Sequence, residues 1–208
     1  MDSSGKNIYR NLKEVVAPEH TALVVWDVQN ALVNTVFNKA EFLSNLKVLI
    51  AAARSSKIPI IYTRITPLPR ALESPWRLYM QMKRYKVADP EKLPPFMLPG
   101  TPEAEIYPDV PPADGDVVLN KHTASIFIGT HFEHMMRNRG INTILFTGIS
   151  TEIGVDSSAR DSANRGFYTI VVADCVSSSD KELHECALKA LTRVCLVMPS
   201  REIMAEWK

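Results

Sequence analysis

The sequence has few cysteines, no long apolar run and almost no excess of charge of either sign. Its 208 residues include 24 basic and 23 acidic ones, which leaves a formal net charge of +1. A nearly neutral chain has no electrostatic footprint for nucleic acid or for an anionic membrane surface. The longest apolar runs, such as TALVVW, are far shorter than the roughly 20 residues that cross a bilayer. We therefore expect a small-molecule partner and neither nucleic acid nor a membrane.

The three cysteines exclude a disulfide framework. Cys175, Cys186 and Cys195 are an odd number and lack the spacing of metal ligands, so free thiols in a reducing compartment explain them best. The polar segment 1–16 has no hydrophobic core of a secretory signal. A cytoplasmic location is the resulting expectation.

Strand-like and helix-like patterns alternate along the chain. This alternation is typical of an α/β domain with a parallel sheet covered on both faces, and the length suits one domain spanning 1–208. The predicted strands are 21–28, 59–65, 116–119, 143–147, 168–173 and 195–198. The predicted helices are 40–55, 76–85, 130–139, 153–165, 181–194 and 201–207.

One long segment, 67–112, breaks this alternation. It holds most of the fourteen prolines, which forbid a continuous helix or a central strand. We interpret it as a loop excursion with one embedded helix near the mouth of a site. Trp76 and Tyr79 on that helix are candidate substrate contacts. Simple packing of an amphipathic helix onto the domain is an equal alternative.

Asp27 follows the apolar run ALVVW, where a buried strand meets solvent. Partial desolvation raises the pKa of a carboxyl group into a range useful for proton transfer, and a nearby lysine lowers it again. Taken alone, a turn or helix-capping aspartate is the commoner role. Gln29, two residues later, is a candidate substrate-binding residue.

Lys121 likewise ends a predicted strand, within DVVLNKHTASIF. An ammonium group beside Asp27 would orient that carboxylate and stabilise developing negative charge. An exposed lysine on a polar rim is the alternative. His122, the next residue, is the histidine that we expect nearest the site.

The stretch 144–167, ILFTGISTEIGVDSSARDSANRGF, predicts a strand, a turn and a helix. Such a turn presents the N–H groups of a helix N-terminus to a ligand. Ser150 and Thr151 on this turn are candidate substrate contacts, and Gly154 lies just beyond them.

Together these three segments resemble the isochorismatase-like hydrolase family, which includes nicotinamidases and N-carbamoylsarcosine amidase. The resemblance covers nearly the whole chain and implies a three-layer α/β/α fold with strand order 3-2-1-4-5-6. It also implies an Asp–Lys–Cys triad, whose first two members match Asp27 and Lys121. A cis peptide at Ile149–Ser150 and a homodimer or homotetramer are further implications. The site is then expected at the topological switch between the first and fourth strands.

The third member of that triad is replaced. The family's usual run is close to TGVATNICVESTARDA, and this chain has TGISTEIGVDSSARDS, so Gly154 stands in the place of the nucleophilic cysteine. A glycine cannot attack a carbonyl carbon. True isochorismatases also have glycine there and cleave a vinyl ether with water, which implies Asp27 as general acid and Lys121 as its organiser. They usually have Ala-His where this chain has Thr151-Glu152, and the Glu152 charge weighs against a dicarboxylate unless it points away.

Other groups provide weaker alternatives. Cys175 is a candidate displaced nucleophile for an amidase, although a small buried thiol is the more frequent role. The sequence places no histidine where it would activate the hydroxyl of Ser150 or Thr151. The histidines form no ligand cluster, and the sequence predicts neither a metal nor a cofactor. The five are His20, His122, His131, His134 and His184.

Two further interpretations remain open at this point. In the first, the chain has lost catalytic activity and binds a metabolite or a partner protein. In the second, Gly154 is an engineered inactivating change.

Overall fold

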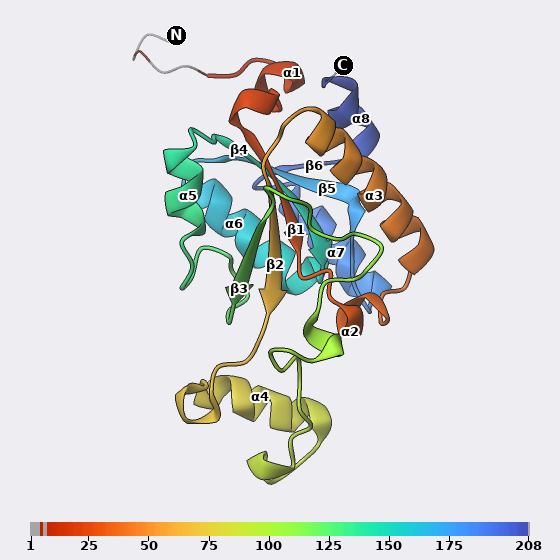
Figure 1. Ribbon diagram of the computed structural model, residues 1–208, viewed down its shortest axis with the longest axis vertical. Helices are drawn as coiled ribbons and strands as arrows, with labels where there is room; N and C mark the ends of the chain where they lie inside the picture. Colours follow the sequence, from red (N-terminus) through yellow and green to blue (C-terminus); the bar gives the residue numbers. More distant parts are fainter. Residues whose placement is uncertain (1–4, 6–7, 208) are drawn as a thin grey trace.

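A computed structural model describes residues 5 and 8–207; the remaining residues of the predicted 1–208 domain, and so part of its polar amino-terminal segment, lie outside the described residues. Six parallel strands form one sheet in the order β3-β2-β1-β4-β5-β6 (Figure 1). This order and the α/β class confirm the prediction. The strands are β1 (Thr21–Trp26), β2 (Ile60–Ile65), β3 (Val117–Lys121), β4 (Thr143–Ile149), β5 (Tyr168–Ser177) and β6 (Leu196–Met198).

The central strands are apolar along their whole length because helices cover both faces of the sheet. All six residues of β1 and all seven of β4 are buried. The two strands pair in parallel from Thr21 opposite Thr143 to Trp26 opposite Gly148. This register places the carboxyl ends of β1 and β4 side by side.

Two apolar clusters flank the sheet. One cluster includes residues of β1, α3 and α8, and the other joins the opposite face of β1 to α5, α6 and α7. Figure 1 shows α3 and α8 on one side of the sheet and α5 and α6 on the other. The helices are α3 (Lys39–Ser55), α5 (Phe132–Asn138), α6 (Asp156–Asn164), α7 (Lys181–Leu191) and α8 (Ser200–Ala205), with the short α1 (Leu12–Val15), α2 (Asn30–Val33) and η1 (Pro18–His20) near the amino end.

Most boundaries differ from the prediction by a few residues, and the structure gives a reason for three of these differences. Strand β1 ends two residues early, since Asp27 adopts a left-handed backbone with φ of 44°, which no strand continues. Strand β5 extends to Ser177, because a register shift opposite Phe146 and Gly148 lets pairing with β4 resume. The helix expected at 153–165 begins as one π-helical segment, η5 (Thr151–Val155), before α6.

The excursion between β2 and β3 contains short helices. Its part around α4 stands apart from the sheet (Figure 1), whereas its later part returns to the domain, where Ile106 bridges Gln29 and Val110 joins an apolar cluster. Its main helix, α4 (Pro75–Tyr85), begins where the Ser74 hydroxyl accepts the Arg77 N–H, and ends at Lys86 in a left-handed conformation. No residue of α4 is buried. The other pieces are η2 (Arg70–Leu72), η3 (Pro90–Lys92) and η4 (Pro102–Ala104).

Across the described part of the chain, no helix combines the length and hydropathy that crossing a membrane requires.

Candidate active site

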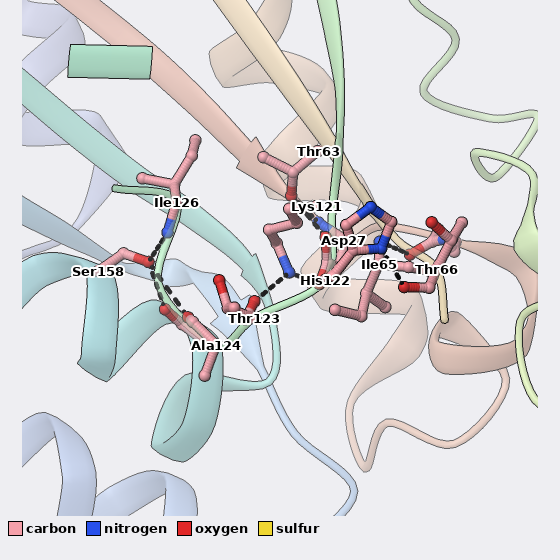
Figure 2. A network of polar contacts seen from close by, with 12 residues as sticks. Asp27, Thr63, Ile65, Thr66, Lys121, His122, Thr123, Ala124, Ile126 and Ser158 are labelled. Carbon is pink, nitrogen blue, oxygen red and sulfur yellow. Dashed lines mark hydrogen bonds and ion pairs between the residues drawn. The ribbon is translucent and has the colours of Figure 1, made fainter. Parts of the chain in front are cut away.

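Asp27 is the centre of a compact polar group at the carboxyl end of β1. Its Oδ1 accepts the Thr63 hydroxyl at 2.5 Å, and its Oδ2 accepts the Lys121 ammonium at 2.5 Å (Figure 2). The backbone N–H of Asp27 donates to Thr63 Oγ1 at 3.0 Å. Asp27 directly follows β1, while Thr63 belongs to β2 and Lys121 to β3; the three residues meet because the strands are parallel neighbours.

Lys121 is the last residue of β3 and is only 1% exposed. Besides Asp27, its Nζ donates to the Thr123 carbonyl at 3.3 Å and lies 3.8 Å from the centroid of a Trp26 ring. A buried ammonium needs such partners, since an isolated charge is costly to bury. The alternative of an exposed rim lysine is therefore wrong.

Burial shifts both pKa values towards the neutral forms. It raises the pKa of Asp27, while the charge and hydrogen bond of Lys121 and the bond from Thr63 oppose that rise. It lowers the pKa of Lys121, against the attraction of Asp27. The proton between these two groups is thus held less firmly by lysine than in water, which suits a pair that transfers protons.

The segment after Lys121 is tied to α6. Ser125 Oγ donates to Asp161 Oδ2 at 2.5 Å. Ser158 Oγ accepts the Ile126 N–H at 3.2 Å (Figure 2). Ser158 Oγ also donates to the Gly154 carbonyl at 2.7 Å. These bonds fix the lysine loop relative to the turn that contains Gly154.

Gly154 faces the side chain of Trp26. An ideal Cβ on Gly154 would lie 2.6 Å from Trp26 Cζ2 and nearer still to Cε2 and Nε1. Both residues are buried. The indole therefore occupies the space that any side chain at 154 would need.

The turn before Gly154 has the expected cis peptide at Ile149–Ser150. The Ser150 carbonyl accepts the N–H groups of Ile153, Gly154 and Val155 at 3.1 to 3.3 Å. The Gly154 N–H is therefore already engaged within the turn and is not a free donor for a ligand.

Thr151 and Glu152 contact β5 and α7. Thr151 Oγ1 donates to the Ser177 carbonyl at 3.1 Å and lies 2.8 Å from His184 Nδ1. Helix α7 folds back beside the turn and brings His184 within hydrogen-bond distance of Thr151, a contact that the sequence did not indicate. That no histidine activates the turn hydroxyls stays a prediction. Because the Thr151 hydroxyl donates its hydrogen to the Ser177 carbonyl, it accepts the hydrogen bond from His184. The two bonds together restrain the Thr151 side chain. Ser178 Oγ donates to Glu152 Oε1 at 2.8 Å.

Gln29 and His122 bind backbone groups. Gln29 is fully buried: its amide donates to the carbonyls of Ile65 and Ala104, and its oxygen accepts the Ile65 N–H. His122 Nδ1 lies 2.8 Å from the Thr66 carbonyl, which can only accept (Figure 2). Both side chains thus fix the end of β2, next to Asp27.

Trp76 and Tyr79 lie on α4, stacked with ring centroids 5.8 Å apart. They are 66% and 48% exposed. Neither residue lines the two hollows at the amino ends of the strands, and no residue of α4 is buried. The link from α4 to the site is Arg77, whose Nη1 donates to the His122 carbonyl at 3.4 Å and pairs with Glu73 at 3.2 Å.

Cys175 is not placed to act as a nucleophile. It is fully buried inside β5, in the apolar cluster beneath α3, whereas Trp26 belongs to the cluster on the opposite face. Burial and the nearby Asp174 raise the pKa of its thiol far above the usual range. The prediction of a small buried thiol is confirmed.

Two hollows of the molecule, of about 360 and 630 Å³, lie at the amino ends of the strands and do not include the Asp27 group. Among the described residues, no cluster of three or more histidine, cysteine or acidic side chains is arranged to hold a metal.

Sequence reasoning missed three residues of this region. Trp26 looked like part of an apolar strand, Thr63 like a strand residue, and His184 like one of several scattered histidines. The alternation of β1 does carry a signal for Trp26, because it lies on the same face of the strand as Val24.

A parallel α/β sheet with a buried Asp–Lys pair at its topological switch defines the class of protein. Residues 21–202 match the isochorismatase domain, so the chain belongs to the isochorismatase family of hydrolases. It is 30% identical over 190 residues to ureidoacrylate amidohydrolase RutB of Pantoea ananatis, with 82% of this chain and 74% of that protein covered.

Solved structures agree with this assignment. An isochorismatase family protein from Burkholderia thailandensis has a TM-score of 0.74 and 27% identity, covering 91% of this chain and 96% of its own. A cysteine hydrolase from Pseudomonas syringae pv. phaseolicola has a TM-score of 0.78 with 98% of each chain covered; at 20% identity it supports the fold alone.

Proposed function

We propose that this protein hydrolyses a small carboxylated metabolite with Asp27 as the proton-transfer group, Lys121 as its organiser and water as the nucleophile. The observation that carries the proposal is the buried contact of 2.5 Å between Asp27 Oδ2 and Lys121 Nζ. A buried ion pair stabilises a fold poorly compared with apolar packing, so this pair is better explained by chemistry.

The reaction class follows from the lack of a nucleophile. Gly154 offers no attacking atom, and the Cys175 thiol is buried on the opposite side of the sheet. In a vinyl ether, Asp27 donates a proton to the alkene carbon, and water adds to the resulting oxocarbenium ion. The hemiketal then breaks into a ketone and an alcohol, and the proton of water returns to Asp27. Burial raises the pKa of Asp27, which favours the protonated form that this first step needs.

Two substrate types have support. Gly154 favours an isochorismate-type vinyl ether. The Glu152 charge still weighs against a dicarboxylate, because Glu152 Oε1 accepts the Ser178 hydroxyl while its buried Oε2 has no hydrogen-bond partner among the described residues. The relatives named ureidoacrylate amidohydrolase favour a ureido or amide acid. Both types are small and carry a carboxylate, so both belong in one assay.

A second candidate function is binding without catalysis. Trp26 fills the space beside Gly154, and Asp27 and Lys121 are only 3% and 1% exposed. If the site is closed in this way, no substrate reaches Asp27, and the protein would bind a metabolite or a partner protein without catalysis.

The test is turnover of isochorismate, followed through pyruvate, and of ureidoacrylate, followed through ammonia, by the wild type and Asp27→Asn. Asp109→Asn is the matched control, because Asp109 forms only an exposed ion pair with Lys47. We expect Asp27→Asn to lower kcat by about 10³-fold or more while Asp109→Asn leaves it unchanged. Turnover that survives Asp27→Asn contradicts the mechanism. No turnover of either substrate favours the binding function.

We further propose that the protein is a single cytoplasmic domain and that it forms a homodimer or homotetramer. The exposed thiol of Cys186 supports a reducing compartment. The exposed aromatic residues of α4 support a second copy covering that helix. Light scattering on the wild type and on Trp76→Ser/Tyr79→Ser measures the mass of each. A monomeric wild type contradicts the oligomer.

A further inference from the structure

Trp26 and Gly154 fit each other too closely for either to be independent. A Cβ on Gly154 would lie 2.6 Å or less from three atoms of the indole, a separation that real Cβ atoms essentially never show. Any side chain at 154 therefore requires Trp26 to move or to be smaller.

Space, not backbone conformation, requires glycine at 154. Its φ lies outside the left-handed region, so an L-residue could adopt its backbone. Gly148 is the opposite case: its φ is 109°, a region that side chains rarely occupy. The glycine at 154 is thus explained by the space that the Trp26 indole takes.

Trp26 cannot easily give way. It is 1% exposed, lies at the end of the central strand and packs in the cluster that contains Phe132, Phe146 and Val155. Its backbone pairs opposite Gly148, where a Cβ would lie 2.7 Å from the Trp26 backbone carbon and nitrogen. Closely packed interiors transmit such a displacement to neighbouring side chains.

The same indole contacts the Lys121 ammonium. Nζ lies 3.8 Å from the centroid of a Trp26 ring and 2.5 Å from Asp27 Oδ2. An aromatic face attracts a cation, most strongly when water is excluded, and tryptophan does so best. The ammonium is therefore held between an aromatic face and a carboxylate.

We propose that Trp26 is a positioning residue of the candidate active site: its indole takes the space beside Gly154 and holds the Lys121 ammonium against Asp27. The inference rests on the proposed function only in one respect, namely that Asp27 and Lys121 take part in proton transfer. It assigns the third corner of the site to an aromatic side chain, where the resemblance implied a cysteine.

The steric half is tested by a double-mutant cycle in urea with Gly154→Ala, Trp26→Leu and both together. We expect the double variant to have a folding equilibrium constant about tenfold or more above the additive value, because a smaller residue at 26 admits a Cβ at 154. Gly140→Ala is the control: nothing lies within 4 Å of its Cβ position, so it should be additive with Trp26→Leu.

Additive effects at 26 and 154 overturn the matched pair. If Gly154→Ala alone does not fold, recovery of folded protein on adding Trp26→Leu is the expected result. A double variant that stays unfolded while Trp26→Leu folds overturns the proposal.

The electrostatic half is tested by an NMR titration of Lys121 in the wild type, Trp26→Phe and Trp26→Leu, with Lys121→Met identifying the signal. Asp27 and Arg77 are the charged groups that act on Lys121, and all three proteins keep them. We expect Trp26→Leu to lower the pKa of Lys121 by about one unit and Trp26→Phe to restore most of it. Equal values in wild type and Trp26→Leu overturn the positioning role. Neither test uses turnover, so a failed assay and a failed inference are distinguishable.

Discussion

The Asp27 site and the α4 excursion are both at the carboxyl ends of the strands, but the chain holds them in different ways. Asp27, Thr63 and Lys121 are buried at the ends of three neighbouring strands and bond one another directly. Helix α4 has no buried residue, and its aromatic side chains face solvent. The site is therefore as rigid as the sheet, whereas α4 has few contacts that would fix it. The contact from α4 to the Asp27 group is the bond from Arg77 to the His122 carbonyl, next to Lys121.

The largest effect is expected from breaking the buried pair. Lys121→Met leaves the Asp27 carboxylate without its ammonium, so we expect a loss of about 3 kcal/mol in the free energy of unfolding at pH 8, measured in urea. Adding Asp27→Asn should recover part of this loss, since no buried charge then remains. A loss below about 1 kcal/mol would contradict a charged pair.

The same variant should depend on pH. Burial raises the pKa of Asp27 above its usual 3.8, and removing Lys121 removes the main opposing cause. The folded state then binds a proton that the unfolded state has released, so stability falls as pH rises from the unfolded towards the folded pKa. We expect Lys121→Met to be less destabilised at pH 5 than at pH 8, whereas the double variant with Asp27→Asn should lose this dependence.

A smaller loss is expected at Thr63, which bonds both the carboxylate and the backbone N–H of Asp27. Thr63→Val keeps the shape and removes these bonds, so we expect about 2 kcal/mol of destabilisation in the same urea titration. Thr35→Val is the control, because its hydroxyl bonds an exposed carbonyl. Equal effects at the two positions would mean that Thr63 does not support the site.

The excursion should respond locally. Ser74→Ala removes the cap of α4 and should cost that helix about 1 kcal/mol. We expect faster hydrogen exchange within α4 and an unchanged global unfolding transition, because α4 contributes nothing to the buried clusters. A matching drop in global stability would show that the excursion is part of the cooperative core.

The smallest effect is expected from Trp76→Ser/Tyr79→Ser. These exposed side chains stack on each other and not on the sheet, so the free energy of unfolding of the isolated chain should change by less than about 0.5 kcal/mol. A larger change that depends on protein concentration would indicate that a second copy covers α4.

Much of the fold follows from pattern. The strands that form β1, β4 and β5 are apolar runs bounded by turn residues, and each was predicted to start where it does. Boundaries that depend on pairing were less accurate: β5 continues to Ser177 because β4 resumes contact after its register shift. Local sequence does not record such pairing.

The candidate site divides in the same way. Asp27 and Lys121 stand out because a charged residue ends an apolar strand, and their pairing follows once the strand order is given. Trp26, Thr63 and His184 do not stand out, since an apolar or hydroxyl residue in a strand is ordinary. Their contacts join positions 36 residues apart for Thr63 and Asp27, and 33 apart for His184 and Thr151.

Hydrophobic periodicity, proline content and side-chain chemistry are local properties, so the α/β alternation, the proline-rich excursion and the glycine at 154 can be read from the sequence alone. Three facts require the tertiary structure: the Trp26 indole fills the space beside Gly154, Thr63 and Lys121 both bond the Asp27 carboxylate, and α4 has no buried residue. These facts depend on which side chains compete for the same volume, and that competition exists only after distant strands and helices have packed together.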